Sequence, residues 1–219
     1  MEKLKLDLIN VAKQAQRIGL CKHKSGNFSV RIPNTNNILV SPSAIDREEL
    51  KSEDLCILDL EGNIIYTKEG IKPSSETMMH LEIYKEREDV NAIVHTHSKF
   101  ASAFAVLNKH IPGIIFEASA FGLKEGYIPV AKYARPGTVE LSKSVIEPVR
   151  IADMFLLEKH GTVSVGCDIK DAFLKAQYIE EIAEIYYMTL VINKGEEPPA
   201  FTVEELNKWK YPEKFKNEG

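Results

Sequence analysis

The sequence predicts an α/β fold in which helices cover a mainly antiparallel sheet. An amphipathic helical pattern opens the chain, short β-type runs separated by turn residues follow it, and helical and strand-like segments then alternate. The chain has 219 residues, of which 44% are hydrophobic and 27% charged. This length and composition are typical of a globular domain that buries a full core without disulfides or structural metals.

The first third of the chain predicts one helix and a series of strands. Apolar residues recur at helical spacing from Leu4 to Ile18, and Gly19 stands where a C-terminal cap is expected. This helix should cover one face of the sheet. The β-type runs that follow are FSVRI, NILVSP, LCILDL and NIIYT, with turn clusters such as PNTNN between them. We expect them to form consecutive antiparallel strands.

Helices and strands alternate in the rest of the chain. The segment KPSSE offers capping groups for a helix that ends near Arg87, and the strand NAIVHTH and the helix FASAFAVL follow it. The pattern weakens after Pro112 and Gly113, which we interpret as turn residues. Beyond them, VELSKSVIEPV predicts one helix, MFLLEKHGTVSV predicts two strands joined at His160 and Gly161, and residues 168–191 predict a long helix.

The chain contains no linker that would divide it, so we expect one domain over residues 1–194. Residues 195–219 contain EEPPA and a charged end with Trp209, and they lack a periodic apolar face. We expect this tail to pack on a neighbouring chain or to stay mobile, with a possible contribution to the site or to an interface.

Charge and cysteine content exclude several classes of partner. The chain has 28 basic and 32 acidic residues, giving a net charge of −4, and no basic block long enough to follow a nucleic-acid backbone. Its three cysteines are far apart and odd in number, which is typical of a reducing cytoplasm rather than of a disulfide framework. The N-terminal segment lacks the apolar core of a signal peptide, and no stretch is long enough to span a membrane.

Three histidines predict a metal site. His95 and His97 are two apart on a predicted strand, so their side chains point to the same face and can reach one ion. His160 ends a second strand, and the glycine after it permits a tight turn. Three neutral imidazoles suit zinc and leave a fourth position for substrate. The alternative is a set of ordinary hydrogen-bonding histidines at strand ends.

A carboxylate and several small polar residues complete the candidate site. Glu76 opens a predicted helix, where a nearby dication would lower its pKa and let it act as a ligand or a base, although it could also be only a helix-start residue. Ser74 and Ser75 precede it and form an anion site or a plain helix cap. The loops SGN (25–27) and SPSA (41–44) could supply further donors to the same anion.

Six motifs, taken together, resemble the class II aldolase/adducin-head family. They are SGNFSVR (25–31), SPSAI (41–45), KPSSE (72–76), VHTHS (94–98), KYARPGT (132–138) and LEKHG (157–161). The resemblance extends to about Lys194 and implies a three-layer α/β/α domain with a central mainly antiparallel sheet. It also implies a homotetramer with sites between subunits, and a metal-dependent aldolase that cleaves a ketose 1-phosphate such as fuculose 1-phosphate to dihydroxyacetone phosphate and an aldehyde.

The resemblance also implies roles for single residues. The metal ligands are matched by His95, His97 and His160, with zinc as the expected ion and manganese or cobalt as alternatives. The phosphate-binding positions are matched by Gly26, Asn27, Ser43, Ser74 and Ser75. Glu76 resembles the catalytic acid/base, and Tyr133 resembles a tyrosine that a neighbouring subunit lends to the site as a proton donor. Tyr211 resembles a C-terminal tyrosine that closes over the aldehyde in some relatives.

Other activities stay open at this point. A methylthioribulose-1-phosphate dehydratase of the same family carries a glutamate near the position of Glu117, and sugar-phosphate epimerases carry aspartate where this chain has Glu76. A sugar-acid phosphate decarboxylase, a zinc hydrolase and a non-catalytic adducin-like scaffold are further alternatives. Ala44 replaces a glycine that is usual in fuculose-phosphate aldolases, which could alter one backbone contact to phosphate.

Overall fold

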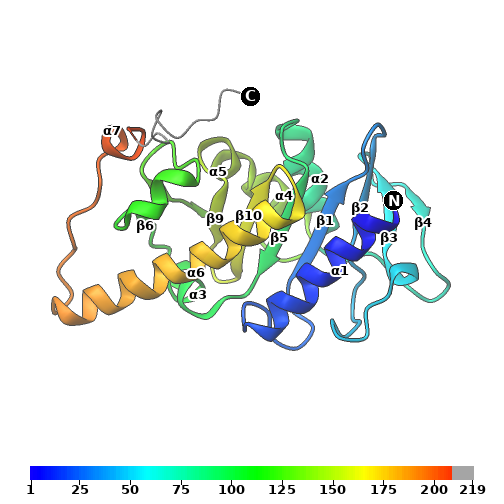
Figure 1. The fold of residues 1–219 in the computed structure, drawn as a ribbon, viewed down its shortest axis with the longest axis horizontal. Coiled ribbons are helices and arrows are strands. Elements are labelled where there is room, and N and C mark those ends of the chain that lie inside the picture. Colours follow the sequence, from blue (N-terminus) through cyan, green and yellow to red (C-terminus); the bar gives the residue numbers. More distant parts are fainter. Residues whose placement is uncertain (209–219) are drawn as a thin grey trace, which may run out of the picture.

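The computed structural model describes residues 1–208, which fold around one eight-stranded sheet (Figure 1). The strands lie in the order β4-β3-β2-β1-β5-β10-β9-β8. Their bounds are β1 Asn27–Arg31, β2 Asn37–Val40, β3 Cys56–Asp59, β4 Ile64–Tyr66, β5 Ala92–Thr96, β8 Val130–Ala131, β9 Met154–Leu157 and β10 Gly161–Gly166. Every pairing in this sheet is antiparallel except that of β8 with β9. The mainly antiparallel sheet and the consecutive order of its first four strands are confirmed.

Helices cover both faces of the sheet. One layer contains α1 (Glu2–Arg17), α3 (Lys99–Val106) and α6 (Ile169–Ile192), and the other contains α2 (Thr77–Glu86), α4 (Val139–Ser144) and α5 (Ile146–Ile151). Alternate residues of β5 show the two faces: Ala92 and Val94 pack under α1 and α6, whereas Ile93 packs under α2. In Figure 1 the long α6 and α1 cross the sheet on the same side. The three-layer α/β/α architecture is therefore confirmed.

The predicted helix over VELSKSVIEPV was wrong in one respect. It consists of two short helices, α4 and α5, which meet at Val145. Pro148 explains the break, because its ring has no N–H to donate and would clash with the carbonyl group of Ser144 in a continuous helix.

The segment after α3 also differs from the expected turn. Ile111–Pro112 form the short strand β6, which pairs with β7 (Tyr127–Ile128) in a separate two-stranded sheet. Between them lies the 3₁₀ helix η2 (Phe116–Ala120). Another 3₁₀ helix, η1 (Ser52–Asp54), precedes β3.

The described part of the tail packs on its own chain. Thr202 caps the one-turn helix α7 (Val203–Leu206) by accepting a hydrogen bond from the Glu205 N–H, and Leu206 is buried in the core beneath it. The Phe201 N–H donates to the carbonyl oxygen of Gly113 at 2.9 Å. The expected packing of the tail on a neighbouring chain stays a prediction. Trp209 and Tyr211 lie outside the described residues. Within residues 1–208, no helix has the length and apolar character that crossing a membrane requires.

Candidate active site

The three histidines predicted as metal ligands lie together where the end of β5 pairs with the start of β10. His95 lies in β5, His97 follows that strand directly, and His160 precedes β10. The two strands pair with Thr162 opposite Thr96, so the three imidazoles become neighbours. Their ring centroids lie 4.8 to 4.9 Å apart, and one nitrogen from each ring lies within 4.8 Å of the others.

Gly161 makes this approach possible. A Cβ atom at this position would lie 2.3 Å from the Thr96 carbonyl oxygen and 3.1 Å from Cδ2 of His97. The glycine that the sequence suggested for a tight turn therefore serves close packing between the strands at the histidine cluster.

Hydrogen bonding fixes the proton on His95. Its Nδ1 faces the Thr162 carbonyl oxygen at 2.8 Å, and because a carbonyl can only accept, Nδ1 donates. The Nε2 atom of the neutral ring then presents a lone pair, and it lies 3.0 Å from Nε2 of His97. Burial, followed by the charge of His95, lowers the pKa of His97 to about 3 and that of His160 to about 4. Neutral imidazoles are the form that binds metals.

Glu76 reaches into the centre of the cluster from the start of α2. Its Oε2 lies 3.1 Å from Nε2 of His95, and its Oε1 lies 3.2 Å from Nε2 of His160. Burial acts to raise the pKa of this carboxyl. A protonated His95, through its charge and its hydrogen bond, outweighs burial together with the charge of a protonated His160 and the hydrogen bond from Asn27, so the pKa is held below its usual range in the metal-free site. The carboxylate therefore remains ionised inside a buried site.

The donor set fits a divalent cation. With its Nδ1 donating to Thr162, a neutral His95 would have no proton on Nε2, and this atom and Oε2 of Glu76 would then meet as two acceptors 3.1 Å apart. Oε1 of Glu76 is buried without a hydrogen-bond donor. A cation among these acceptors would remove the repulsion, and three histidines with a carboxylate are a set that zinc accepts.

A buried chain of hydrogen bonds holds Glu76. Asn27 Nδ2 donates to Oε2 of Glu76 at 2.7 Å, and Oδ1 of the same amide lies 2.5 Å from Nε2 of His80. Because Oδ1 can only accept, His80 Nε2 donates and its Nδ1 accepts from Ser29 Oγ at 2.6 Å. The Tyr84 hydroxyl lies 2.8 Å from Ser29 Oγ and ends the chain. His80 therefore reaches Glu76 through Asn27.

All five predicted phosphate-binding residues line one cavity of about 210 Å³, together with Glu76, His97 and His160. Gly26 has φ +78°, and a Cβ there would lie 2.5 Å from Cys21 Sγ and 2.7 Å from the His95 carbonyl oxygen. The structure thus brings the small-residue loops to the histidine cluster. The amide of Ser43 already donates to the Lys72 carbonyl and that of Ser74 to the Ser41 carbonyl, so these two residues would offer their hydroxyl groups to a ligand.

Sequence reasoning missed Arg47, which lines the same cavity. Its side chain is only 2% exposed, and its guanidinium donates to backbone carbonyl oxygens of the loop that contains Gly26. In the segment IDREEL an arginine is expected at the surface, and no local sequence signal marks this one as buried.

Two predicted residues do not reach the cluster within the chain. The Tyr133 side chain is 54% exposed, with its ring 5.5 Å from Lys159 Nζ, and it does not line the cavity. Glu117 is exposed in η2. Neither residue lines the histidine-lined cavity of its own chain.

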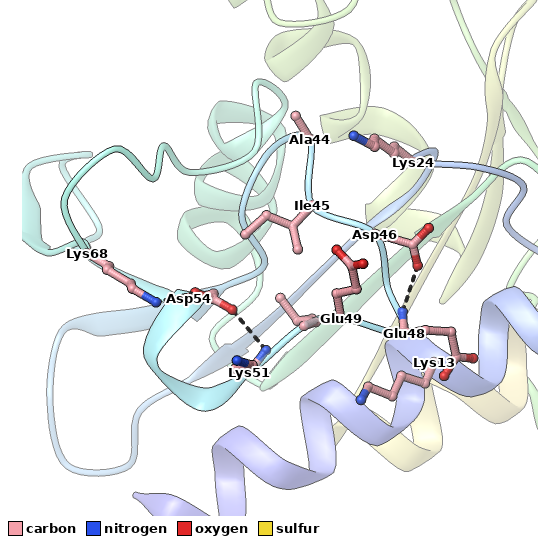
Figure 2. Close-up of a pocket in the computed structure, with 11 residues that line it drawn as sticks. Lys13, Lys24, Ala44, Ile45, Asp46, Glu48, Glu49, Lys51, Asp54 and Lys68 are labelled. Carbon is pink, nitrogen blue, oxygen red and sulfur yellow. Dashed lines mark hydrogen bonds and ion pairs between the residues drawn. The ribbon is translucent and has the colours of Figure 1, made fainter.

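A larger cavity of about 690 Å³ lies beside the site (Figure 2). It shares Lys24 and Ala44 with the histidine-lined cavity, but otherwise it is lined mainly by charged residues from 45–54 and by lysines of neighbouring segments. Several of these charges are paired, as in the contact of Lys68 with Asp54 at 3.2 Å. No histidine lines it, so the histidine cluster opens only into the smaller of these two cavities.

Comparison with known proteins gives consistent matches over nearly the whole chain. Residues 6–187 match the class II aldolase and adducin N-terminal domain family. The chain is 39% identical over 186 residues to an L-fuculose phosphate aldolase of Methanococcus maripaludis, covering 84% of this chain and 97% of the relative. It is 34% identical over 208 residues to a 5-deoxy-D-ribulose 1-phosphate aldolase of Bacillus thuringiensis, covering 95% of both chains. The solved structure of an L-fuculose 1-phosphate aldolase has a TM-score of 0.86 and 31% identity, covering 94% of this chain and 93% of the other.

Proposed function

The chain belongs to the class II aldolase and adducin N-terminal domain family, and we propose that it cleaves a ketose 1-phosphate to dihydroxyacetone phosphate and an aldehyde. The observation that carries the proposal is a single cavity of about 210 Å³ lined by His97 and His160 of the histidine cluster, by Glu76 and by three serine-containing segments. Such a cavity can hold the phosphate and the carbonyl end of one small sugar phosphate together.

In this proposal His95, His97 and His160 hold a divalent cation. Zinc is the expected ion because of the three imidazole donors, with manganese or cobalt as alternatives. When bound, the ion supplies positive charge that stabilises the enediolate left by breaking the carbon–carbon bond. This is the task that a Schiff-base lysine performs in other aldolases.

Glu76 handles the proton at the reacting carbon. After the bond between the two fragments breaks, the enediolate carbon needs one proton to become dihydroxyacetone phosphate. Glu76, which takes up a proton from solvent for this step, delivers it. The hydroxyl group that becomes the aldehyde loses its proton at the same time, and we assign its removal to the phenolate form of Tyr133 from a neighbouring subunit, which afterwards returns the proton to solvent. In the synthetic direction the two residues exchange roles.

Gly26, Asn27, Ser43, Ser74 and Ser75 bind the phosphate in this proposal, and their place in the cavity supports it. Asn27 also donates to Glu76, so it links the phosphate end of the cavity to the acid/base. The exposed position of Tyr133 supports an oligomer, expected to be a homotetramer, with sites shared between subunits. The expected compartment is the cytoplasm, because the cysteines are unpaired.

The substrate can be identified with a panel of ketose 1-phosphates. The relatives' names, L-fuculose phosphate aldolase and 5-deoxy-D-ribulose 1-phosphate aldolase, suggest fuculose and 5-deoxyribulose 1-phosphates, and the panel adds rhamnulose and methylthioribulose 1-phosphates. Metal-loaded enzyme is incubated with each, and dihydroxyacetone phosphate is measured by a coupled assay. Release from one sugar establishes aldol cleavage and identifies the aldehyde. Loss of water from methylthioribulose 1-phosphate without release would contradict it and favour a dehydratase that uses Glu117.

A further inference from the structure

Arg47 is a buried cation without an acidic partner. Its side chain is 2% exposed, and across residues 1–208 no carboxylate oxygen lies within 4.0 Å of its guanidinium. Its charge interacts with the Cys21 thiol and, less strongly, with the carboxylate of the adjacent Asp46. A guanidinium remains charged in proteins, and a buried charge is costly unless an opposite charge or a full set of hydrogen bonds compensates it.

The hydrogen bonds of Arg47 join the two loops on one side of the cavity. Nη2 donates to the Gly26 carbonyl oxygen and lies 3.3 Å from that of Lys24 and 3.5 Å from that of Ser25. Nη1 lies 3.4 Å from the Ile45 carbonyl oxygen. The guanidinium therefore binds loop 24–26 to the start of segment 45–47. These carbonyl oxygens point toward the guanidinium, so their negative ends do not repel an anion in the cavity.

One donor of Arg47 has no partner among residues 1–208, and its charge faces carbonyl dipoles and the ring of Phe28, whose centroid lies 5.8 Å from Cζ. Its Nε is buried without a hydrogen-bond partner. Carbonyl dipoles solvate a positive charge but do not neutralise it. Arg47 also lines the cavity that contains Ser43, Ser74 and Ser75, so its field acts on whatever occupies that space.

We propose that Arg47 is a positioning residue that holds loop 24–26 in its anion-binding shape and whose charge is balanced by the dianionic phosphate of the substrate. This inference rests on the proposed function, because that function supplies the phosphate. It adds a selectivity that the histidines and serines do not explain: the cavity takes a doubly charged group in preference to a neutral one.

Inorganic phosphate is the probe, because it tests the anion site without requiring the correct sugar. The metal-loaded enzyme is titrated with phosphate by calorimetry, next to the variants Arg47→Met and Arg47→Lys. The control is Arg17→Met, which removes an exposed arginine that pairs with Glu48 outside the cavity and changes net charge equally. Far-ultraviolet circular dichroism and metal content confirm that each variant is folded and loaded.

We expect Arg47→Met to weaken phosphate binding about tenfold to a hundredfold, because loop 24–26 loses its support and the phosphate loses the balancing charge. Arg47→Lys should stay within about fivefold of the wild type, since an ammonium group keeps the charge and three donors for the loop carbonyls. Arg17→Met should bind as the wild type does. If Arg47→Met does not fold, Arg47→Gln replaces it as a neutral variant whose amide can still donate to a carbonyl.

Steady-state kinetics distinguish a specific effect of Arg47 on phosphate binding from a general loss of enzyme activity. With the ketose 1-phosphate found by the panel, the neutral variant should raise KM about tenfold or more and change kcat less than about threefold. With the same ketose lacking its phosphate, the neutral variant should have the same low cleavage rate as the wild type. Wild-type phosphate affinity in the neutral variant, or equal losses with both ketoses, would overturn the inference while leaving aldol cleavage intact. Failure of the wild type to bind phosphate would instead refute the proposed phosphate site.

Discussion

The orientation of Glu76 depends on residues that never touch it. Tyr84, Ser29 and His80 form a hydrogen-bonded series that ends on Asn27, and the carbonyl oxygen of that amide accepts from His80. This leaves the Asn27 NH₂ group to face Glu76, because a flipped amide would set two acceptors against each other. Burial lowers the pKa of His80 to about 3, so the ring stays neutral and its single N–H remains on Nε2.

Replacing His80 should therefore misorient Glu76 without removing the metal. We expect His80→Phe to lower kcat about tenfold to a hundredfold while metal content stays at the wild-type level, since the phenyl ring fills the space but cannot donate to Asn27. Tyr84→Phe is the matched control, because Ser29 can still donate to His80 when the last hydroxyl is absent. A large loss of kcat in Tyr84→Phe and none in His80→Phe would show that these hydrogen bonds do not orient Glu76 through His80.

Glu76 itself can be tested by proton exchange. Glu76→Gln keeps the size of the side chain and removes its ability to accept a proton, so exchange of the carbon-bound hydrogen of dihydroxyacetone phosphate with solvent should fall by about 10² to 10⁴. Metal content, measured by atomic emission, should remain near the wild-type level because three histidines remain. Exchange at the wild-type rate would remove Glu76 from the acid/base role.

His95 should be the histidine whose loss releases the metal. It contacts Glu76, His97 and the Thr162 carbonyl group, so it lies at the centre of the cluster. His95→Ala should lose both bound metal and activity, whereas His23→Asn, a change of an exposed histidine, should lose neither. Full metal occupancy with normal turnover in His95→Ala would refute the ligand assignment.

At the scale of the elements, the junction of β5 and β10 sets the geometry of the cluster. A Cβ on Gly161 would lie 2.3 Å from the Thr96 carbonyl oxygen and 3.3 Å from Cε1 of His95. Gly161→Ala should therefore lower the free energy of unfolding by about 1–3 kcal/mol and weaken metal binding, because the strands must separate beside the ligands. Urea unfolding and metal titration measure the two effects.

Gly70→Ala is the control for this change. Gly70 has φ +76° and open space around its Cβ position, so alanine there adds backbone strain without a steric clash. It should reduce stability and leave metal affinity unchanged. A loss of metal affinity in both variants would indicate a general effect of destabilisation rather than the strand junction.

Helices and strands with a clear hydrophobic period or a recognisable motif were predicted correctly from the sequence. The helix over 168–191, the four-strand meander and the H-x-H strand carry strong local patterns, and all are present. Prediction failed where tertiary structure decides: Pro148 divides a continuous helical pattern, and β6 is too short to show a period. Arg47 is the clearest case in the site, because its burial depends on carbonyl groups more than twenty residues away along the chain.

For the whole molecule, buried histidines link stability to pH. The pKa of His80 and of His97 is about 3 and that of His160 about 4 in the folded metal-free protein, against about 6.5 for an ordinary histidine. The unfolded chain therefore binds more protons than the folded chain between pH 6.5 and 4. This contribution to stability is fully present above pH 6.5 and is lost as pH falls through the folded values.

Metal-free protein should accordingly unfold at a lower urea concentration at pH 5 than at pH 7.5. The difference should shrink in His80→Phe, which removes one of the three groups, and persist in His23→Asn. An equal urea midpoint at the two pH values would show that these histidines are not held neutral in the folded chain.

The assembly supplies the last test, because Tyr133 lies on the surface of its own chain. If it acts on a neighbour's site, Tyr133→Phe chains have intact metal sites and His95→Ala chains have intact tyrosines, so each homo-oligomer is impaired by a different defect. Mixed oligomers would contain some sites with wild-type histidines and a wild-type tyrosine from the adjacent subunit. Co-expression with two affinity tags, followed by tandem purification, should thus recover activity above that of either parent. Confirmed hybrids without recovery would show that Tyr133 does not complete a neighbouring site.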